Sequence, residues 1–200
     1  MKILPSGAVL EVGTGEGHFL CALNPGRYEV VGVEASAEAA ATARRRIADR
    51  GLRGGVRQGS LHDAGLPAET FDLIALFGSL GGAGSPRAIC MEVARLLRSG
   101  GYAVIETPSL SSLTALLCGT RWRPLRDPHS DYFFSPACLD RLLSSCGLSP
   151  GVARMPVPVG WPSPGNLVYI TRKSSIAIRA TSLTDLASNV GNIAPMGAAH

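Results

Sequence analysis

Short apolar runs alternate with stretches of helix-forming residues along most of the chain. The run FDLIALF (Phe71–Phe77) is almost continuously apolar, as in a strand that is buried on both faces of a sheet. Serine followed by proline, at Ser85-Pro86 and Ser135-Pro136, is a common helix start, and apolar residues recur at helical spacing after both pairs. The expected strands lie at residues 9–12, 28–34, within 54–60, 71–77 and 102–108, and the expected helices near 19–23, over 37–50, from 86 to the glycines at 100–101, and over 136–146.

This order of elements predicts the fold class. Strands that alternate with helices are joined by right-handed crossovers, which gives a mostly parallel sheet covered by helices on both faces. Two last β-rich segments, Val152–Val159 and Asn166–Arg172, flank the turn sequence Trp-Pro-Ser-Pro-Gly and predict a hairpin. Pro156 and Pro158 limit the first of them to edge or irregular pairing. The expected fold is α/β: an open, doubly wound, mostly parallel sheet with a C-terminal β-hairpin.

The size and composition of the chain suit one domain with a tail. It has 200 residues, of which 46% are apolar and 17% are charged, so a sizeable core is expected. We place the domain at residues 1–173 and a flexible tail at residues 174–200, where the sequence carries little apolar pattern. The segment Ser109–Phe134, rich in arginine, proline and aromatic residues, is expected to be irregular.

Charge and cysteine content narrow the class of protein. The net charge is +4, and the one dense basic run, Arg44-Arg45-Arg46, falls in an expected helix, so it is interpreted as a solvated face rather than a nucleic-acid patch. The five cysteines are scattered and never form a C-x-x-C pair, which favours reduced thiols and neither disulfides nor a metal site. No apolar run is long enough for a membrane span, and no signal peptide is recognisable. A cytoplasmic protein without a metal is expected.

The stretch VLEVGTGEGHFL (Val9–Leu20) carries the strongest candidate for chemistry. Gly13, Gly15 and Gly17 lie between an expected strand and an expected helix. Glycine permits a positive φ and a close approach of another molecule to the backbone, and such a turn exposes N–H groups and the positive end of a helix. A plain glycine-rich strand–helix turn is the alternative. In a doubly wound sheet, Glu11, the glycine turn, Glu34, Ser60, Phe77 and Thr107 would share the rim at the carboxyl ends of the strands, where ligands bind.

The glycine pattern differs from the dinucleotide fingerprint G-x-G-x-x-G, because the residue at the third glycine position is His18. The pattern E-x-G-x-G-x-G (Glu11–Gly17) instead resembles the first motif of the class I S-adenosylmethionine-dependent methyltransferases. Four further matches follow in order, of which the first is the acid Glu34 at the end of the second strand. The others are RQGSLHDAGLPAETFDLIAL, EVARLLRSGGYAVIETP and YFFSPACLDRLLSSCGL. The last is similar to a helix of the subgroup that includes ubiquinone and menaquinone biosynthesis methyltransferases, and the resemblance covers residues 6–173.

The resemblance implies a Rossmann-like fold, S-adenosyl-L-methionine as cofactor and a methyltransferase activity (EC 2.1.1.-) on a small-molecule acceptor. Glu34 would accept hydrogen bonds from the ribose hydroxyls, Glu11 would lie beneath the glycine turn near the methionine amino group, and Phe77 would lie under the transferable methyl. Leu61 would flank the adenine through its backbone. The implied cofactor-binding set is Glu11, Gly13, Thr14, Gly15, Gly17, Glu34, Ala35, Ser60, Leu61 and Phe77.

Two features depart from the family's pattern. The acid that usually contacts the adenine amino group is Ser60 here, so that contact is a hydroxyl or is lost, and Asp63 is the less favoured substitute. Most relatives also have one or two helices ahead of the first strand that close over the site, and this sequence has none. We therefore expect either an open site, covered by a protein partner or a second copy, or a shortened form of the protein.

The segment from Arg121 to Phe134 is the expected substrate wall. His129 is the first candidate base, with Asp131 and Tyr132 behind it, although a surface histidine in a polar loop is as good an interpretation. The leading hypothesis is a small-molecule methyltransferase. A cofactor-binding module that is inactive or needs a partner is the alternative, and an NAD-dependent oxidoreductase is disfavoured by His18 and by the lack of a recognisable Ser/Tyr/Lys set.

Overall fold

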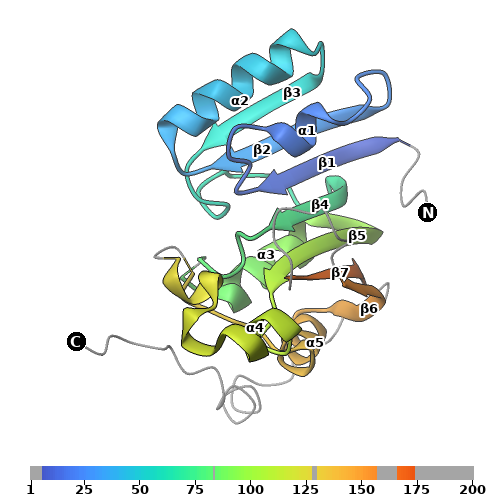
Figure 1. Ribbon diagram of the computed structural model, residues 1–200. Helices are drawn as coiled ribbons and strands as arrows, with labels where there is room; N and C mark the ends of the chain where they lie inside the picture. Colours follow the sequence, from blue (N-terminus) through green and yellow to red (C-terminus); the bar gives the residue numbers. More distant parts are fainter. Residues whose placement is uncertain (1–5, 83, 128–129, 157–165, 174–200) are drawn as a thin grey trace.

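A seven-stranded sheet forms the centre of the molecule (Figure 1). The computed structural model describes residues 6–82, 84–127, 130–156 and 166–173. Along the sheet the strands follow the order β3-β2-β1-β4-β5-β7-β6, in which β1 to β5 are parallel and β7 is antiparallel to both of its neighbours. The strands are β1 (Gly7–Val12), β2 (Tyr28–Glu34), β3 (Arg53–Gln58), β4 (Phe71–Phe77), β5 (Leu97–Pro108), β6 (Leu148–Pro156) and β7 (Asn166–Lys173).

Helices cover both faces of the sheet. Two pack with β1, β2 and β3 around a core that contains Val9, Val30 and Ile47, and two others pack against β4 and β5. The helices are α1 (His18–Cys21), α2 (Ala37–Asp49), α3 (Pro86–Leu96), α4 (Leu113–Cys118) and α5 (Pro136–Ser145), with 3₁₀ turns η1 (Gly119–Arg121) and η2 (Arg123–Arg126). Among the residues described, no helix combines the length and the apolar character needed to cross a bilayer.

Serine side chains cap three of the helices, as the sequence predicts for Ser85 and Ser135; the cap at Ser36 was not predicted. The Oγ atoms of Ser36, Ser85 and Ser135 each accept a hydrogen bond of 3.3 Å from the backbone N–H three residues later. Such a cap satisfies one of the free N–H groups of the first turn and stabilises a helix by about 1 kcal/mol.

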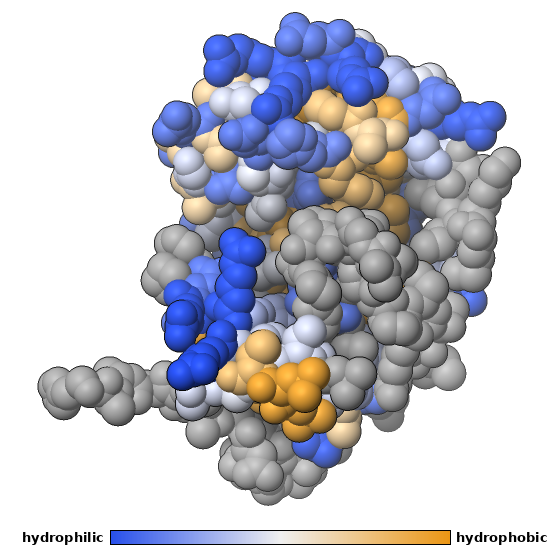
Figure 2. Space-filling view, in the orientation of Figure 1, coloured by the Kyte–Doolittle hydropathy of each residue, from blue (hydrophilic) through white to orange (hydrophobic). Residues whose placement is uncertain are grey.

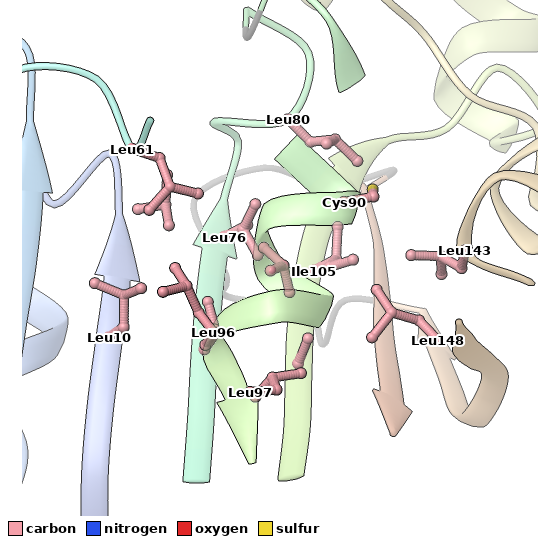
Figure 3. Packing of buried hydrophobic residues seen from close by; sticks show 14 of the residues in the cluster. Leu10, Leu61, Leu76, Leu80, Cys90, Leu96, Leu97, Ile105, Leu143 and Leu148 are labelled. Carbon is pink, nitrogen blue, oxygen red and sulfur yellow. The ribbon is translucent and has the colours of Figure 1, made fainter. Parts of the chain in front are cut away.

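The larger core lies on the α3 and α5 side of the sheet. Leu76 of β4, Leu96 of α3 and Leu143 of α5 are fully buried and point into the same layer (Figure 3). Leu10 and Leu61 extend this layer towards β1 and the loop after β3. Both faces of the parallel strands are therefore covered, as the continuous apolar run of β4 predicts.

Three elements differ from the sequence-based expectation. The helix that begins at Pro86 ends at Leu96 instead of continuing to the glycines, because Leu97 pairs with Phe71 in the sheet and is fully buried there. The last hairpin starts earlier, at Leu148. Residues 109–134, expected to be irregular, contain α4 and two 3₁₀ turns. The tail at 174–200 lies outside the described residues.

The sheet has its topological switch point between β1 and β4. From β1 the chain continues outward to β2 and β3, and then returns to the other side of β1 to form β4 and β5. In doubly wound sheets, ligands bind beyond the carboxyl ends of the strands at this point. Here the glycine turn after β1 and the Phe77–Ser79 loop after β4 meet at that position, since a Cβ atom placed on Gly13 would lie 2.8 Å from Cβ of Ser79.

Candidate active site

The turn after β1 has the backbone conformation that its glycines allow. Gly13, Gly15 and Gly17 have φ values of 72°, 53° and 81°. The N–H groups of Gly13 and Thr14 both donate to the carbonyl of Val33, at 2.9 and 3.1 Å, which ties the turn to the end of β2. Side chains other than glycine adopt this region of φ with strain. The turn and the carboxyl end of β2 therefore form one hydrogen-bonded unit.

The three glycines face different surroundings. An added Cβ on Gly13 would collide with Ser79, and one on Gly17 would lie 3.0 Å from Cβ of Ala43 in α2. An added Cβ on Gly15 would have none of the described atoms within 4 Å. Gly13 and Gly17 thus permit close packing within the protein, whereas Gly15 faces open space.

Glu34, the last residue of β2, is bonded to this turn. Its Oε2 accepts a hydrogen bond of 2.8 Å from the N–H of Gly15, and its Oε1 accepts one of 2.9 Å from the N–H of Ser36. Each carboxylate oxygen keeps a further lone pair, so the group can also accept hydrogen bonds from two neighbouring hydroxyls of a ligand. Ala35, the next residue, is exposed at the same rim.

Glu11 lies beneath the turn and is 4% exposed. Burial, together with the nearby Glu34 carboxylate, raises the pKa of Glu11 to about 8, although a backbone hydrogen bond from Leu20 acts in the opposite direction. Within the described part of the chain, its Oε2 is buried without a hydrogen-bond partner. The Oγ1 of Thr14 donates to the Glu11 carbonyl at 3.0 Å, so the side chain of Thr14 supports the turn from below and is itself buried.

The loop after β3 holds the residues expected beside an adenine ring. Gly59 donates its N–H to the Glu34 carbonyl at 2.9 Å, which brings this loop to the end of β2. Ser60 Oγ donates to the Asp63 carboxylate at 2.5 Å and accepts from the Asp63 N–H at 3.2 Å. Leu61 is 2% exposed and packs in the larger core. An exposed carboxylate therefore lies directly beside Ser60, at the position where the family's acid is absent.

The floor of the site after β4 is aromatic and open. The Phe77 ring is half-buried and packs edge-on against Phe19 of α1, with ring centroids 4.9 Å apart. Gly78 follows with a φ of 71°, and an added Cβ there would meet none of the described atoms within 4 Å. Phe19 is a contact of the site that the sequence did not single out; its helical position behind the turn was the available signal.

Two buried hydroxyls line the same rim. Ser79 Oγ after β4 and Thr107 Oγ1 at the end of β5 have no hydrogen-bond partner among the described residues. Thr107 was expected at this rim, but Ser79 was not. The Glu106 carboxylate is also buried here and accepts a hydrogen bond of 2.9 Å from Asn166 of β7. The residues of this group come from segments far apart in the sequence, so no local motif predicts that they lie at one rim.

The expected substrate wall reaches the rim through Tyr132. Its N–H donates to the Gly81 carbonyl at 3.0 Å, and its hydroxyl donates to the Gly84 carbonyl at 2.9 Å. The loop after β4 and the segment before α5 are therefore bonded together. His129 lies outside the described residues.

The residues present fit S-adenosylmethionine. An added Cβ on Gly15 or on Gly78 would meet none of the described atoms within 4 Å, the Glu34 carboxylate is bonded to Gly15, and Glu11, which precedes the turn, has a buried oxygen without a partner among the described residues. A ribose needs paired acceptors, a methionine chain needs a floor without side chains, and its ammonium needs a nearby carboxylate.

Comparison with known protein families identifies the kind of domain to which these residues belong. Residues 10–105 match the family described as "Methyltransferase domain", a segment that runs from β1 to β5 and includes the glycine turn, Glu34 and Phe77. Residues 10–105 thus form a methyltransferase domain of the class I, S-adenosylmethionine-dependent type.

Individual proteins resemble the chain in sequence or in fold. The chain is 36% identical over 101 residues to a phosphatidylethanolamine N-methyltransferase of Cereibacter sphaeroides, a match that spans 50% of this chain and about half (49%) of that protein. Its fold is similar to a SAM-dependent methyltransferase of Methanosarcina mazei, with a TM-score of 0.69, 19% identity, and coverage of 86% of this chain and 94% of that one. A chain of the Haloferax volcanii complex between the Trm112 methyltransferase activator and a methyltransferase also has a TM-score of 0.69, at 18% identity, over 87% of this chain and 85% of that one.

Proposed function

We propose that this protein transfers the methyl group of S-adenosylmethionine to a small-molecule acceptor in the cytoplasm. The observation that carries the proposal is the Glu34 carboxylate, held at the end of β2 by Gly15 and Ser36 beside a turn with open space above it. Five free cysteines suit a reducing compartment. The FSPACLDRLL sequence, which begins α5, favours the ubiquinone and menaquinone biosynthesis subgroup.

The protein's part in the reaction is mainly positioning. The cofactor supplies an electrophilic methyl group on a sulfonium, so no metal or covalent enzyme intermediate is needed. Glu34 holds the ribose hydroxyls, the surface without a side chain at Gly15 lies against the methionine end, and Phe77 keeps water from beneath the methyl group. Ser60 and Asp63 provide the polar contact at the adenine.

An acceptor that must lose a proton needs a base near it. We propose His129 for this role, with Tyr132 as a positioning residue. Because the Tyr132 proton is engaged by the Gly84 carbonyl, its oxygen remains able to accept a hydrogen bond from an acceptor O–H or N–H.

A phospholipid amine is a second candidate acceptor. The relative that is 36% identical is named for N-methylation of phosphatidylethanolamine, and the matched 101 residues span half of this chain. A partner-dependent or inactive cofactor-binding module is the third hypothesis, which the similarity to a chain of the Trm112 complex supports.

Two measurements test the proposal. In calorimetric titration, S-adenosylhomocysteine should bind and NAD should not; the reverse would establish a dinucleotide site and refute the proposal. Transfer of labelled methyl from S-adenosylmethionine is then measured with phenolic small molecules and with phosphatidylethanolamine vesicles as acceptors. Transfer to the vesicles alone would favour the phospholipid, and binding with no transfer to any acceptor would favour the module that needs a partner.

A further inference from the structure

The most exposed large hydrophobic side chains among the described residues belong to α4, the helix that follows β5. Leu116 and Leu117, at the end of α4, are 71% and 85% exposed. We call residues Leu113–Arg126, which comprise α4, η1 and η2, the α4–η2 segment. Figure 2 shows a group of hydrophobic (orange) side chains at the position that α4 has in Figure 1. Hydrophilic (blue) side chains lie beside it, at the position of the 3₁₀ turns, which are yellow in Figure 1. Two adjacent leucines this far into solvent are unfavourable unless something covers them.

Three arginines follow the leucines within the same segment. Arg121, Arg123 and Arg126 are exposed, and among the residues described none of their guanidinium groups forms an ion pair or a hydrogen bond. Elsewhere, Arg46, Arg95 and Arg98 are paired with acids. The α4–η2 segment thus offers an apolar tip together with unpaired positive charge.

The segment is firmly held despite this exposure. Trp122, between the two 3₁₀ turns, is 3% exposed and packs against Phe133, with ring centroids 5.9 Å apart. Ser112 caps α4 by accepting from the N–H of Ala115 at 3.1 Å. The leucines and arginines therefore project from a fixed base and do not turn inwards.

We propose that the α4–η2 segment docks the protein on an anionic lipid bilayer. Leu116 and Leu117 enter the boundary between headgroups and acyl chains, while the arginines bind lipid phosphates. A six-residue helix with two protruding leucines offers too little area for a stable protein interface, which buries at least about 1,000 Å². Shallow insertion combined with charge attraction needs much less area. This complementarity favours a membrane surface over a protein partner.

Docking would place the site against the headgroup layer. The segment is joined to the rim through the pairing of Ser109 with Phe134 and through the bonds of Asp131 and Tyr132 to the Gly81 carbonyl. The loop that carries Phe77 and Gly78 leads directly into Gly81. An acceptor dissolved in or attached to the bilayer would then reach the methyl group without leaving the membrane surface.

Vesicle cosedimentation of the full chain, without cofactor or acceptor, tests the proposal independently of methyl transfer. Vesicles of phosphatidylcholine with phosphatidylglycerol should bind the protein, vesicles of phosphatidylcholine alone should bind it much less, and 0.5 M NaCl should weaken binding. The L116S/L117S variant should lose at least about tenfold in partitioning. The R121Q/R123Q/R126Q variant should lose about fivefold for each arginine.

Matched controls separate docking from general attraction of a basic protein. Met91→Ser removes a 48% exposed apolar side chain on α3, and R45Q/R50Q/R53Q removes three other exposed arginines. Both controls should bind vesicles nearly as the unmodified protein does. Equal losses for the two arginine variants, or no vesicle binding at all, would overturn the proposal. A leucine variant that dissociates a dimer in light scattering but binds vesicles normally would show instead that a second copy covers the leucines.

Discussion

At the scale of single residues, the site depends on carboxylates whose surroundings differ. Glu34 has both oxygens occupied by backbone N–H groups and remains at the rim, so its orientation is set before any ligand binds. Glu11, 23 residues earlier and one strand away, is buried and has an unpartnered oxygen. The first is organised for hydrogen bonding, while the second favours protonation in the free protein.

Replacing Glu34 with alanine should weaken S-adenosylhomocysteine binding by about 1.5–3 kcal/mol, because a charged acceptor of hydroxyl hydrogen bonds is lost. Calorimetry gives the affinity, and urea unfolding shows whether the protein still folds without the bonds from Gly15 and Ser36 to the carboxylate. Glu38→Ala, which removes an exposed acid from the first turn of α2, is the control and should bind normally. Equal affinity in both variants would exclude Glu34 from the site.

Glu11 should make stability fall with rising pH. Its pKa is about 8 in the folded protein against 4.5 for the ordinary group, so between these values the folded state binds more protons than the unfolded state. The free energy of unfolding therefore decreases as the pH rises through this window. Glu11→Gln removes the titration, and relative to the unmodified protein it should gain on the order of 2–4 kcal/mol between pH 4.5 and 8.5. Urea unfolding at both pH values measures this difference; parallel pH profiles would contradict it.

At the scale of elements, the glycine turn shows that residues alike in sequence can have separate tasks. Gly13 brings the turn close to the loop after β4, and Gly17 brings it close to α2. Gly15 contacts neither element, although its φ is equally positive. The spacing of the three glycines predicts a tight turn. Only the atoms around each glycine show that Gly13 and Gly17 pack against other segments, whereas Gly15 faces open space.

Substitution of Gly15 by alanine should therefore affect binding more than folding. The left-handed φ costs roughly 1–2 kcal/mol with a Cβ present, and the Cβ projects into the space proposed for the methionine chain. Gly65→Ala is a matched control, because Gly65 has a φ of 57° and open space around it but lies in the loop before β4. Both variants should lose similar stability in urea unfolding, and only Gly15→Ala should lose affinity for S-adenosylhomocysteine. Normal binding by Gly15→Ala would mean that the turn is purely structural.

At the scale of the whole molecule, one sheet separates two cores and supports the rim between them. The core on the α3 and α5 side includes residues of β1, β2, β4 and β5, and the core on the α1 and α2 side includes residues of β1, β2 and β3. The site lies at the switch point between β1 and β4. Its geometry should thus depend on packing far from any ligand.

Leu76→Ala should destabilise the protein by about 2–5 kcal/mol, because it leaves a cavity in the larger core. Leu117→Ala removes the same atoms from an 85% exposed position and should change stability by less than about 0.5 kcal/mol. Thermal or urea unfolding measures both. A similar loss for the two leucines would show that Leu117 is covered in solution, for example by another copy of the chain.

Much of the fold could be read from the sequence alone. The apolar run of β4, the serine–proline helix starts and the turn sequence before β7 are local signals, and they predicted the order of the elements along the chain, the mixed sheet and the last hairpin. The right-handed crossover rule then brought Glu11, Glu34, Ser60 and Phe77 to one rim. These features follow from the sequence because burial, capping and crossover handedness depend on residues that are close together in the chain.

Only the tertiary structure decided which atoms meet at that rim and which face solvent. The early end of α3 follows from the pairing of Leu97 with Phe71, and the Tyr132 hydroxyl is directed by a carbonyl 48 residues away. The exposure of Leu116 and Leu117 and the open space above Gly15 depend likewise on what other segments leave uncovered. Hydrophobic periodicity reports whether a residue is buried in its own element, but a contact between distant segments is set by how the whole sheet packs.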